Sequence, residues 1–178
     1  VEASLYTLSA EGETAVTLLG ESQPVIWLNS GPSVAEPEQR LNTQWSEPIE
    51  LVCMDDLPEA LERGNEMTVR LVWQAAGEVR EDYTAFLHLV DADGMLLAQQ
   101  DQPPGGIFYP TSAWRVGDRI ETVFTLTVPD GSAPDSYRLL AGLYDPDSGE
   151  RLPIDGNGDV TLLAKIDVEV EESSPESE

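Results

Sequence analysis

The sequence predicts an all-β fold, an antiparallel two-sheet β-sandwich of immunoglobulin-like or jelly-roll-like type with little helix. Three observations predict it. Several segments alternate apolar and polar side chains with a period of two, turn-forming residues separate these segments at short intervals, and a helix-like pattern occurs in one short stretch only. That stretch, residues 57–63, is as consistent with a loop as with a helical turn. The 178 residues, 40% of them hydrophobic, suffice for one domain with a real core.

The strands are predicted by where apolar side chains recur. The clearest alternation is found in three segments, 66–75, 119–128 and 160–170. Residues 83–90 and 137–144 are apolar on both faces, which is typical of central strands. From these segments we expect the following residues in the core: Trp73, Leu87, Phe124, Leu126, Leu139, Leu143 and Ile166.

Turn residues separate these strands. The sequence DADG at 91–94 is expected to close a hairpin between 83–90 and 95–101. DPDSG at 145–149 reverses the chain again, and DGNGD at 155–159 leads into the last strand. Tyr137, which opens a strand after Pro-Asp-Ser, predicts a tyrosine corner whose hydroxyl bonds to nearby backbone.

The ends of the chain differ from its middle. Residues 1–47 contain three short strand-like segments, 3–8, 14–19 and 24–28, followed by a polar linker at 29–47. They form either an edge of the sandwich or part of a neighbouring module. Residues 48–170 are the predicted sandwich domain. The acidic residues 171–178 are expected to be a disordered tail.

Charge limits the partners of the protein. It has 34 acidic and nine basic residues, a formal net charge of −25. Such a surface repels phosphate backbones, so nucleic-acid binding is excluded and anionic membranes are disfavoured. No apolar run approaches 18 residues, so we expect no direct membrane insertion of this fragment. The only cysteine, Cys53, lies in an apolar run and is expected to be buried rather than reactive.

The sequence provides no catalytic residues. His88 is the only histidine, and no nucleophile motif accompanies it, so we expect a structural histidine hydrogen-bonded within the sandwich. With one histidine and one cysteine, a zinc site is improbable. Among 34 acids some pair always lies at a glycosidase-like spacing, so carboxylate pairs carry no signal. We therefore expect a protein that is not an enzyme.

One weak metal candidate remains. Asp155, Asn157 and Asp159 alternate in a way that can present oxygen atoms to Ca²⁺. The complete twelve-residue calcium loop is missing, and a tight turn explains the same residues. We expect no cofactor, with Ca²⁺ as the minor alternative.

The segment 103–117 is the most informative one for ligand binding. It is rich in Pro and Gly, yet it carries Phe108, Tyr109 and Trp114, followed by Arg115. One interpretation is a glycan site in which rings stack on sugars and Arg115 bonds to hydroxyls. The other is a crossover between the two sheets whose rings fill one end of the core.

Residues 48–170 also carry a set of motifs: LVWQA at 71–75, DYTAFLHLVDADG at 82–94, AQQDQPPGG at 98–106, YPTSAW at 109–114 and YRLLAGLYDPDSGERLP at 137–153. In order and spacing this stretch resembles the C-terminal extracytoplasmic β-sandwich of bacterial multi-spanning glycosyltransferase-like membrane proteins.

The resemblance implies a domain on the cell surface or in a periplasm-like space, tethered by sequence outside this fragment. It further implies a noncatalytic accessory module whose partner is a glycan or the membrane domain of the parent chain. A purely structural or protein-interaction sandwich is the alternative.

Overall fold

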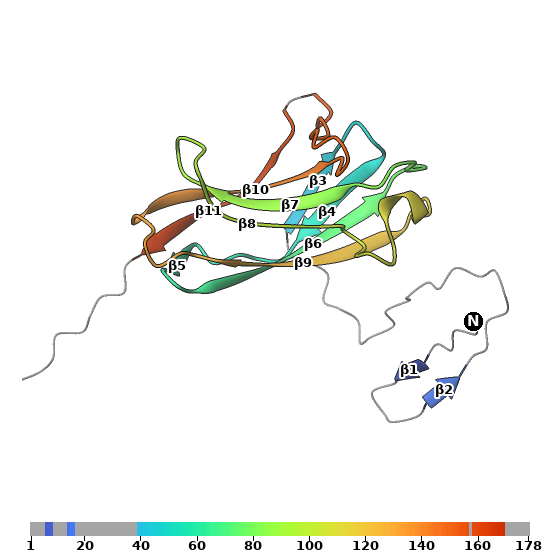
Figure 1. Cartoon of the computed structure of the whole chain (residues 1–178), viewed down its shortest axis with the longest axis horizontal. Helices are drawn as coiled ribbons and strands as arrows, with labels where there is room; N and C mark the ends of the chain where they lie inside the picture. The colour runs from blue at the N-terminus through green and yellow to red at the C-terminus, as the bar shows by residue number, and fades with distance from the viewer. Residues whose placement is uncertain (1–5, 9–13, 17–38, 157, 170–178) are drawn as a thin grey trace, which may run out of the picture. The chain divides into compact units, whose positions relative to one another are not determined.

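The computed structural model describes residues 6–8, 14–16, 39–156 and 158–169, and the chain divides into two compact units, 1–35 and 36–178. In the first unit, β1 (Tyr6–Leu8) pairs antiparallel with β2 (Thr14–Val16) (Figure 1). Both strands fall within segments expected to be extended. The predicted strand at 24–28 and the acidic tail lie outside the described residues.

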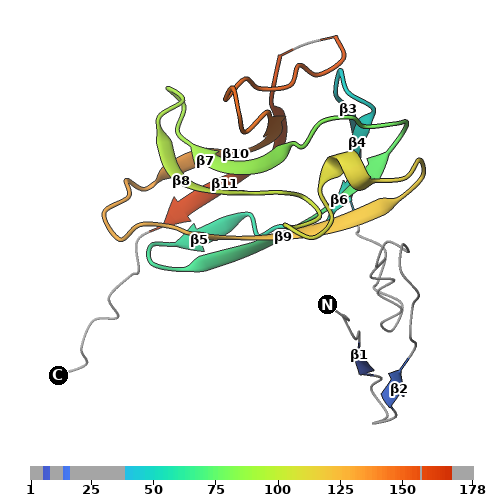
Figure 2. The same cartoon turned by 45° about the vertical axis from the view of Figure 1, so that its right-hand side comes forward.

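The second unit is a two-sheet β-sandwich, so the predicted fold class is confirmed (Figure 2). One sheet has the order β3-β4-β6-β9 and consists of Gln39–Gln44, Ile49–Met54, Glu66–Ala75 and Arg119–Thr127. The other has the order β5-β11-β10-β7-β8 and consists of Ala60–Glu62, Thr161–Glu169, Asp135–Tyr144, Thr84–Val90 and Leu96–Gln102. All neighbours are antiparallel except β5, which runs parallel to β11. No helix in the described residues is long and apolar enough to span a membrane.

Two short strands lie where the sequence pattern indicates none. β5 occupies 60–62 within the helix-like stretch, where pairing with β11 overrides local helix propensity. β3 occupies 39–44 within the expected polar linker. It is an edge strand with polar side chains and a bulge at Asn42, whose φ is 55°. An edge strand is paired on one side only, so it needs few apolar residues and shows little periodicity.

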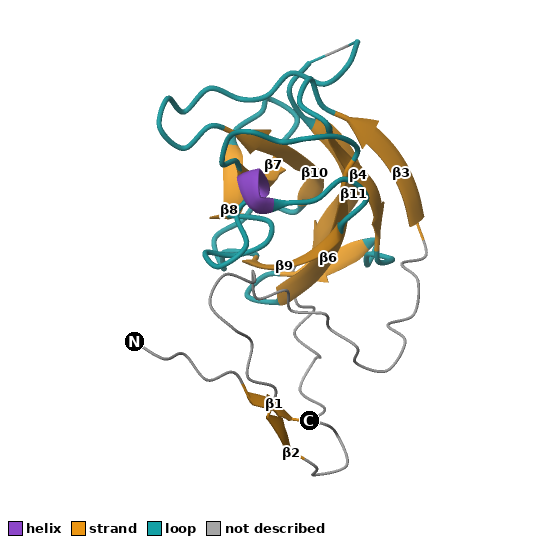
Figure 3. Ribbon diagram, turned by 90° about the vertical axis from the view of Figure 1, so that its right-hand side faces the viewer, coloured by secondary structure: helices purple, strands orange, loops and turns teal. Residues whose placement is uncertain are grey.

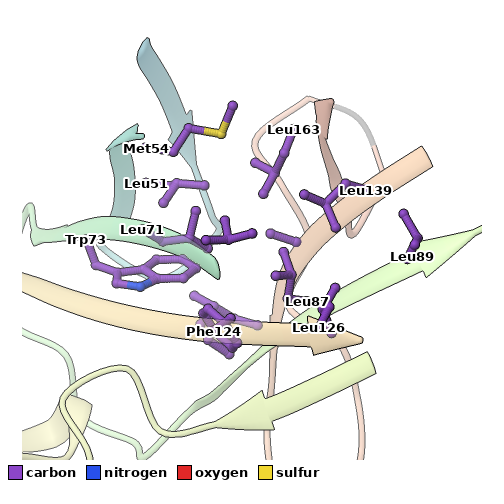
Figure 4. Packing of buried hydrophobic residues seen from close by; sticks show 14 of the residues in the cluster. Leu51, Met54, Leu71, Trp73, Leu87, Leu89, Phe124, Leu126, Leu139 and Leu163 are labelled. Atoms are coloured by element: carbon purple, nitrogen blue, oxygen red, sulfur yellow. The ribbon is translucent and has the colours of Figure 1, made fainter. Parts of the chain in front are cut away.

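The core lies between the sheets. All seven residues predicted to be buried are buried, and Figure 4 shows several of them converging from both layers. Alternation is strict in β9, whose even-numbered residues point inward. The buried indole of Trp73 donates to the Thr122 hydroxyl, which in turn donates to the carbonyl of Pro104. Cys53 is buried, as expected.

The tyrosine corner is confirmed. The Tyr137 hydroxyl donates to the carbonyl oxygen of Ala133 at 3.1 Å. The predicted hairpin at 91–94 is also present, because β7 and β8 pair in antiparallel register on either side of it. These local devices fix the ends of the central strands β10 and β7.

Glutamine side chains join the two sheets along one side. Gln102 donates from Nε2 to the carbonyl of Val123 at 2.7 Å, and the side-chain oxygen of Gln100 accepts from the backbone N–H of Thr125. Both glutamines belong to the edge strand β8. The backbone groups to which they bond, the carbonyl of Val123 and the N–H of Thr125, belong to the edge strand β9. We call this contact the glutamine seam.

Four connections meet at one end of the sandwich: 45–48, 76–83, 103–118 and 145–160. The strand registers bring them together, since Thr84 pairs with Tyr144 at this end of one sheet and Ile49 with Ala75 at this end of the other. Figure 3 shows the short 3₁₀ helix Thr111–Ala113 of the third connection at this end. We call it the loop end.

Candidate functional site

The crossover loop, residues 103–118, leads from β8 in one sheet to β9 in the other. After a turn at Pro103–Gly106 come two more, which we call its first and second turns, Gly106–Tyr109 and Arg115–Asp118; each of the three is closed by a backbone hydrogen bond. Asp118 ties the first and second turns together, because its carboxylate accepts from the Tyr109 hydroxyl and from the backbone N–H of Arg115. The segment is therefore a crossover with internal structure.

Two buried side chains anchor this loop. The hydroxyl of Thr111 accepts from the backbone N–H of Tyr83 and donates to the carbonyl of Glu81. Trp114 packs into the core cluster and donates from its indole to the carbonyl of Tyr109. A Cβ at Gly105 would lie 2.1 Å from that same carbonyl oxygen, so only glycine permits the close approach.

The four residues of the predicted glycan contact therefore have different surroundings. Trp114 is 5% exposed and fills the end of the core, as the crossover interpretation expects. Tyr109 is half-buried, and burial together with the bond to Asp118 raises the pKa of its hydroxyl. Phe108, by contrast, is 85% exposed, and Arg115 in the second turn is exposed as well. Within the loop, the rings of Trp114 and Tyr109, which carry polar atoms, face inward, and the phenyl ring of Phe108 faces solvent.

A second group of candidate side chains lies on the outer face of the five-stranded sheet. In β7, Leu87 and Leu89 point into the core, so Phe86 and His88 point out. The register places Phe86 opposite Asp101 of β8 and opposite Gly142 of β10. This corrects the expectation for His88, which lies on the outer face of the sandwich. Its Nε2 is 3.5 Å from Asp101 Oδ1 and makes no hydrogen bond within the described residues.

The connection 145–160 completes this group. The guanidinium of Arg151 lies 4.7 Å above the centre of the Phe86 ring and pairs with Asp159 at 3.6 Å. Tyr144 packs against the same ring. We call the six residues the outer-face cluster: Phe86, His88, Asp101, Tyr144, Arg151 and Asp159.

Close packing holds the cluster in place. A Cβ at Gly142 would lie 2.3 Å from the Phe86 ring and 2.9 Å from the carbonyl oxygen of Asp159. Glycine at 142 thus allows the ring to lie flat on β10 and the loop to lie over it. Phe86 is buried as a result, although it points away from the core.

Burial controls the protonation of the cluster. Desolvation lowers the pKa of His88, against the opposing effect of Asp101 and together with the repulsion of Arg151. Desolvation and the neighbouring Asp101 raise the pKa of Tyr144. Near neutral pH the cluster therefore presents a neutral imidazole and a neutral phenol beside two carboxylates and one guanidinium.

The sequence alone did not indicate this cluster. Phe86 and His88 occur in an apolar run, and Arg151 follows a turn 63 residues later. Only the register of β7 with β8 and β10 brings them together. One signal was available in the apolar run that forms β7. A strand that is apolar on both faces indicates that other residues cover the outer face of its sheet as well.

The structure describes two of the three residues of the candidate calcium site, Asp155 and Asp159. Asp159 lies beside Arg151 in the outer-face cluster, and Asn157 lies outside the described residues. Within the described residues, no group of three or more His, Cys, Asp or Glu side chains is arranged to hold a metal ion. Weak Ca²⁺ binding at 155–159 stays a prediction.

No family model matches the chain, and no curated protein does. Among solved structures, the β-glucosidase of Listeria innocua in complex with isofagomine is similar at 15% identity and a TM-score of 0.43. That match covers 67% of this chain, which spans only 16% of the enzyme.

Two smaller proteins are also similar. The C-terminal domain of Wzt matches at 13% identity and a TM-score of 0.42, covering 75% of this chain and 81% of its own. The CARDB domain of a Pyrococcus furiosus protein matches at 13% identity and a TM-score of 0.37, covering 66% and 88%. These are β-sandwich domains, and the likeness concerns the fold alone.

Proposed function

We propose that this domain is a noncatalytic, extracytoplasmic accessory module that recognises glycan for a membrane glycosyltransferase-like protein. The observation that carries the proposal is the outer-face cluster. It gathers hydrogen-bonding side chains around a buried ring on the solvent-facing side of a rigid sheet.

The chemistry of the cluster suits sugar hydroxyls. Each hydroxyl both donates and accepts, so a site for them needs both kinds of partner. Asp101 and Asp159 accept, and the guanidinium of Arg151 donates. The pKa directions keep Tyr144 and His88 neutral near pH 7, so the cluster has little net charge. A neutral sugar fits this balance better than a polyanion does.

The placement of His88 and Cys53 supports the choice of binding over nucleophilic catalysis in this proposal. His88 lies on the outer face of the five-stranded sheet, whereas the only thiol, Cys53, belongs to β4 in the other sheet. A histidine–cysteine pair is therefore not formed.

A glycan array with the isolated domain, run with and without Ca²⁺, tests the proposal. We expect binding that Arg151→Ala weakens at least tenfold and that Arg80→Ala, at an exposed arginine of another connection, leaves unchanged. Thermal melts in parallel show whether each variant is folded. Absence of glycan binding by the folded wild-type domain would contradict the proposal, and so would an Arg151→Ala variant that binds normally.

The proposed compartment needs the full gene product. We expect membrane spans or an export signal outside this fragment, with the domain accessible to protease added to intact cells. A full product that lacks both, or a domain protected in intact cells, would contradict the extracytoplasmic location.

A protein-interaction sandwich is the second candidate. The observation in its favour is the exposed apolar part of the crossover loop, none of whose residues belongs to the outer-face cluster.

A further inference from the structure

We infer that the first and second turns of the crossover loop form a docking surface for a basic polypeptide, one that offers an apolar pocket bordered by Lys or Arg. The surface is defined by Ile107, Phe108 and Val116, and we call it the apolar tip. The inference is independent of the glycan proposal, which concerns the outer-face cluster.

The apolar tip is unusually exposed. Ile107 and Phe108, the two central residues of the first turn, are 79% and 85% exposed, and Val116 in the second turn is 68% exposed. Asp118 holds the turns together through Tyr109 and Arg115, so the three side chains belong to one tied structure. Three exposed apolar side chains on two linked turns favour a partner that covers them.

The tip is also preorganised. Thr111 fixes the loop to the segment before β7, and Trp114 fixes it to the core. Ser112 adds a backbone N–H donated to the side chain of Asp82. Binding through a loop that is already ordered loses little conformational entropy, so exposed apolar area there contributes efficiently to affinity.

The charges around the tip select the partner. The four connections of the loop end carry ten carboxylates against three arginines, a formal net charge of −7. Asp82 and Asp118 bond to the loop itself. Burial raises the pKa of Tyr83, and Glu47, Glu81 and Asp145 lie close enough to raise it further. A second copy of this chain and an anionic lipid surface would both be repelled, whereas a Lys- or Arg-bordered pocket is complementary.

The exposed side chains favour polypeptide over sugar. Sugar platforms combine a ring face with polar edges that bond to hydroxyls. In this loop the polar-edged rings are committed inward, because Trp114 is buried and the Tyr109 hydroxyl is bonded to Asp118. Two aliphatic side chains and one phenyl ring remain exposed, together with Arg115 of the second turn. This is the composition of an apolar interface core with a charged rim, within a loop end whose net charge is acidic.

Fluorescent peptides test this inference. The probe is a set with a Leu-Phe-Leu core flanked by Lys and Arg, and its matched set carries Glu at the flanking positions. Fluorescence anisotropy should show binding of the basic set only, weakened several-fold as salt rises.

Phe108→Ser and Ile107→Ser should each weaken binding of the basic peptides at least tenfold. Met95→Ser is the matched control, since Met95 is 69% exposed in the hairpin at the opposite end of the sandwich. The connections of that end, 55–65 with the short strand β5, 91–95 and 128–134, carry seven carboxylates against one arginine, a formal −6, close to the −7 of the loop end.

Four results would overturn the inference. Two concern the wild type: the basic peptides do not bind, or the acidic set binds equally well. Two concern a folded Phe108→Ser variant: its affinity for the basic peptides is unchanged, or it loses glycan binding and keeps peptide binding. Binding to phosphatidylcholine vesicles in place of peptide would assign the tip to lipid and overturn it likewise. If the Arg151→Ala variant loses glycan binding and still binds peptide, the two sites are separate. Each proposal can therefore fail without affecting the test of the other.

Discussion

Trp114 and Phe108 lie six residues apart in one loop and have opposite surroundings. Replacing Trp114 with alanine removes a buried ring and leaves a cavity at the loop end, which should cost about 3–5 kcal/mol of unfolding free energy. Phe108→Ala removes an exposed ring, and its effect should stay within about 0.5 kcal/mol. Urea unfolding of both variants measures the difference. Equal destabilisation by the two variants would show that the loop is not anchored as described.

His88 gives the protein a distinct response to acid. Burial lowers its pKa in the folded state, so near its ordinary pKa the unfolded chain binds the proton more readily. The stability that neutral His88 provides is therefore complete above about pH 7 and is lost as pH falls through about 6.5 and below. Relative to His88→Gln, the wild type should lose stability between about pH 7.5 and 5.5 in urea titrations. A relative gain would mean that Asp101 outweighs burial.

For single residues, the sequence predicted which side chains are buried better than it predicted which residues they contact. Four of the seven core residues follow from period-two alternation: Trp73, Phe124, Leu126 and Ile166. Leu87, Leu139 and Leu143 follow from apolar runs, and Tyr137 follows from a local turn; all of these patterns depend on neighbours in the chain. The side of the sheet on which His88 lies does not follow, because its whole segment is apolar and gives no alternation to read.

The packing of β10 against β7 depends on one glycine. Gly142→Ala places a methyl group against the Phe86 ring and the carbonyl of Asp159, so it should destabilise by more than about 2 kcal/mol. It should also displace the connection 145–160 and weaken any glycan binding at the cluster. Gly131→Ala is the control, since a Cβ there meets nothing within 4 Å. Calorimetry of the two variants compares them directly.

Elements with strong periodicity were predictable, and their partners were not. Segments 66–75 and 119–128 match β6 and β9 closely, because each has one buried face. The short strands β3 and β5 have little apolar content and exist through pairing. The outer-face cluster combines β7, β8 and β10 with a long connection, so it required the registers of three strands at once.

The whole molecule is strongly self-repelling at neutral pH. A net charge of −25 on 178 residues destabilises the compact state, and salt screens that repulsion. The melting temperature should therefore rise as NaCl increases from about 10 to 500 mM, where the Debye length falls to a few ångströms. Salt also weakens the ion pair of Arg70 with Asp55, but partly exposed pairs contribute little. A falling melting temperature would show that such pairs dominate.

The glutamine seam also limits how the domain can meet other proteins. Where an edge strand offers free backbone groups, a foreign strand can extend the sheet, which is the usual start of fibre growth and of peptide capture by backbone pairing. Along β9 the side-chain amides of Gln100 and Gln102 already bond to the N–H of Thr125 and the carbonyl of Val123. We therefore expect strand addition at this edge of the four-stranded sheet to be disfavoured even when many copies are crowded together, so that recognition there depends on side chains.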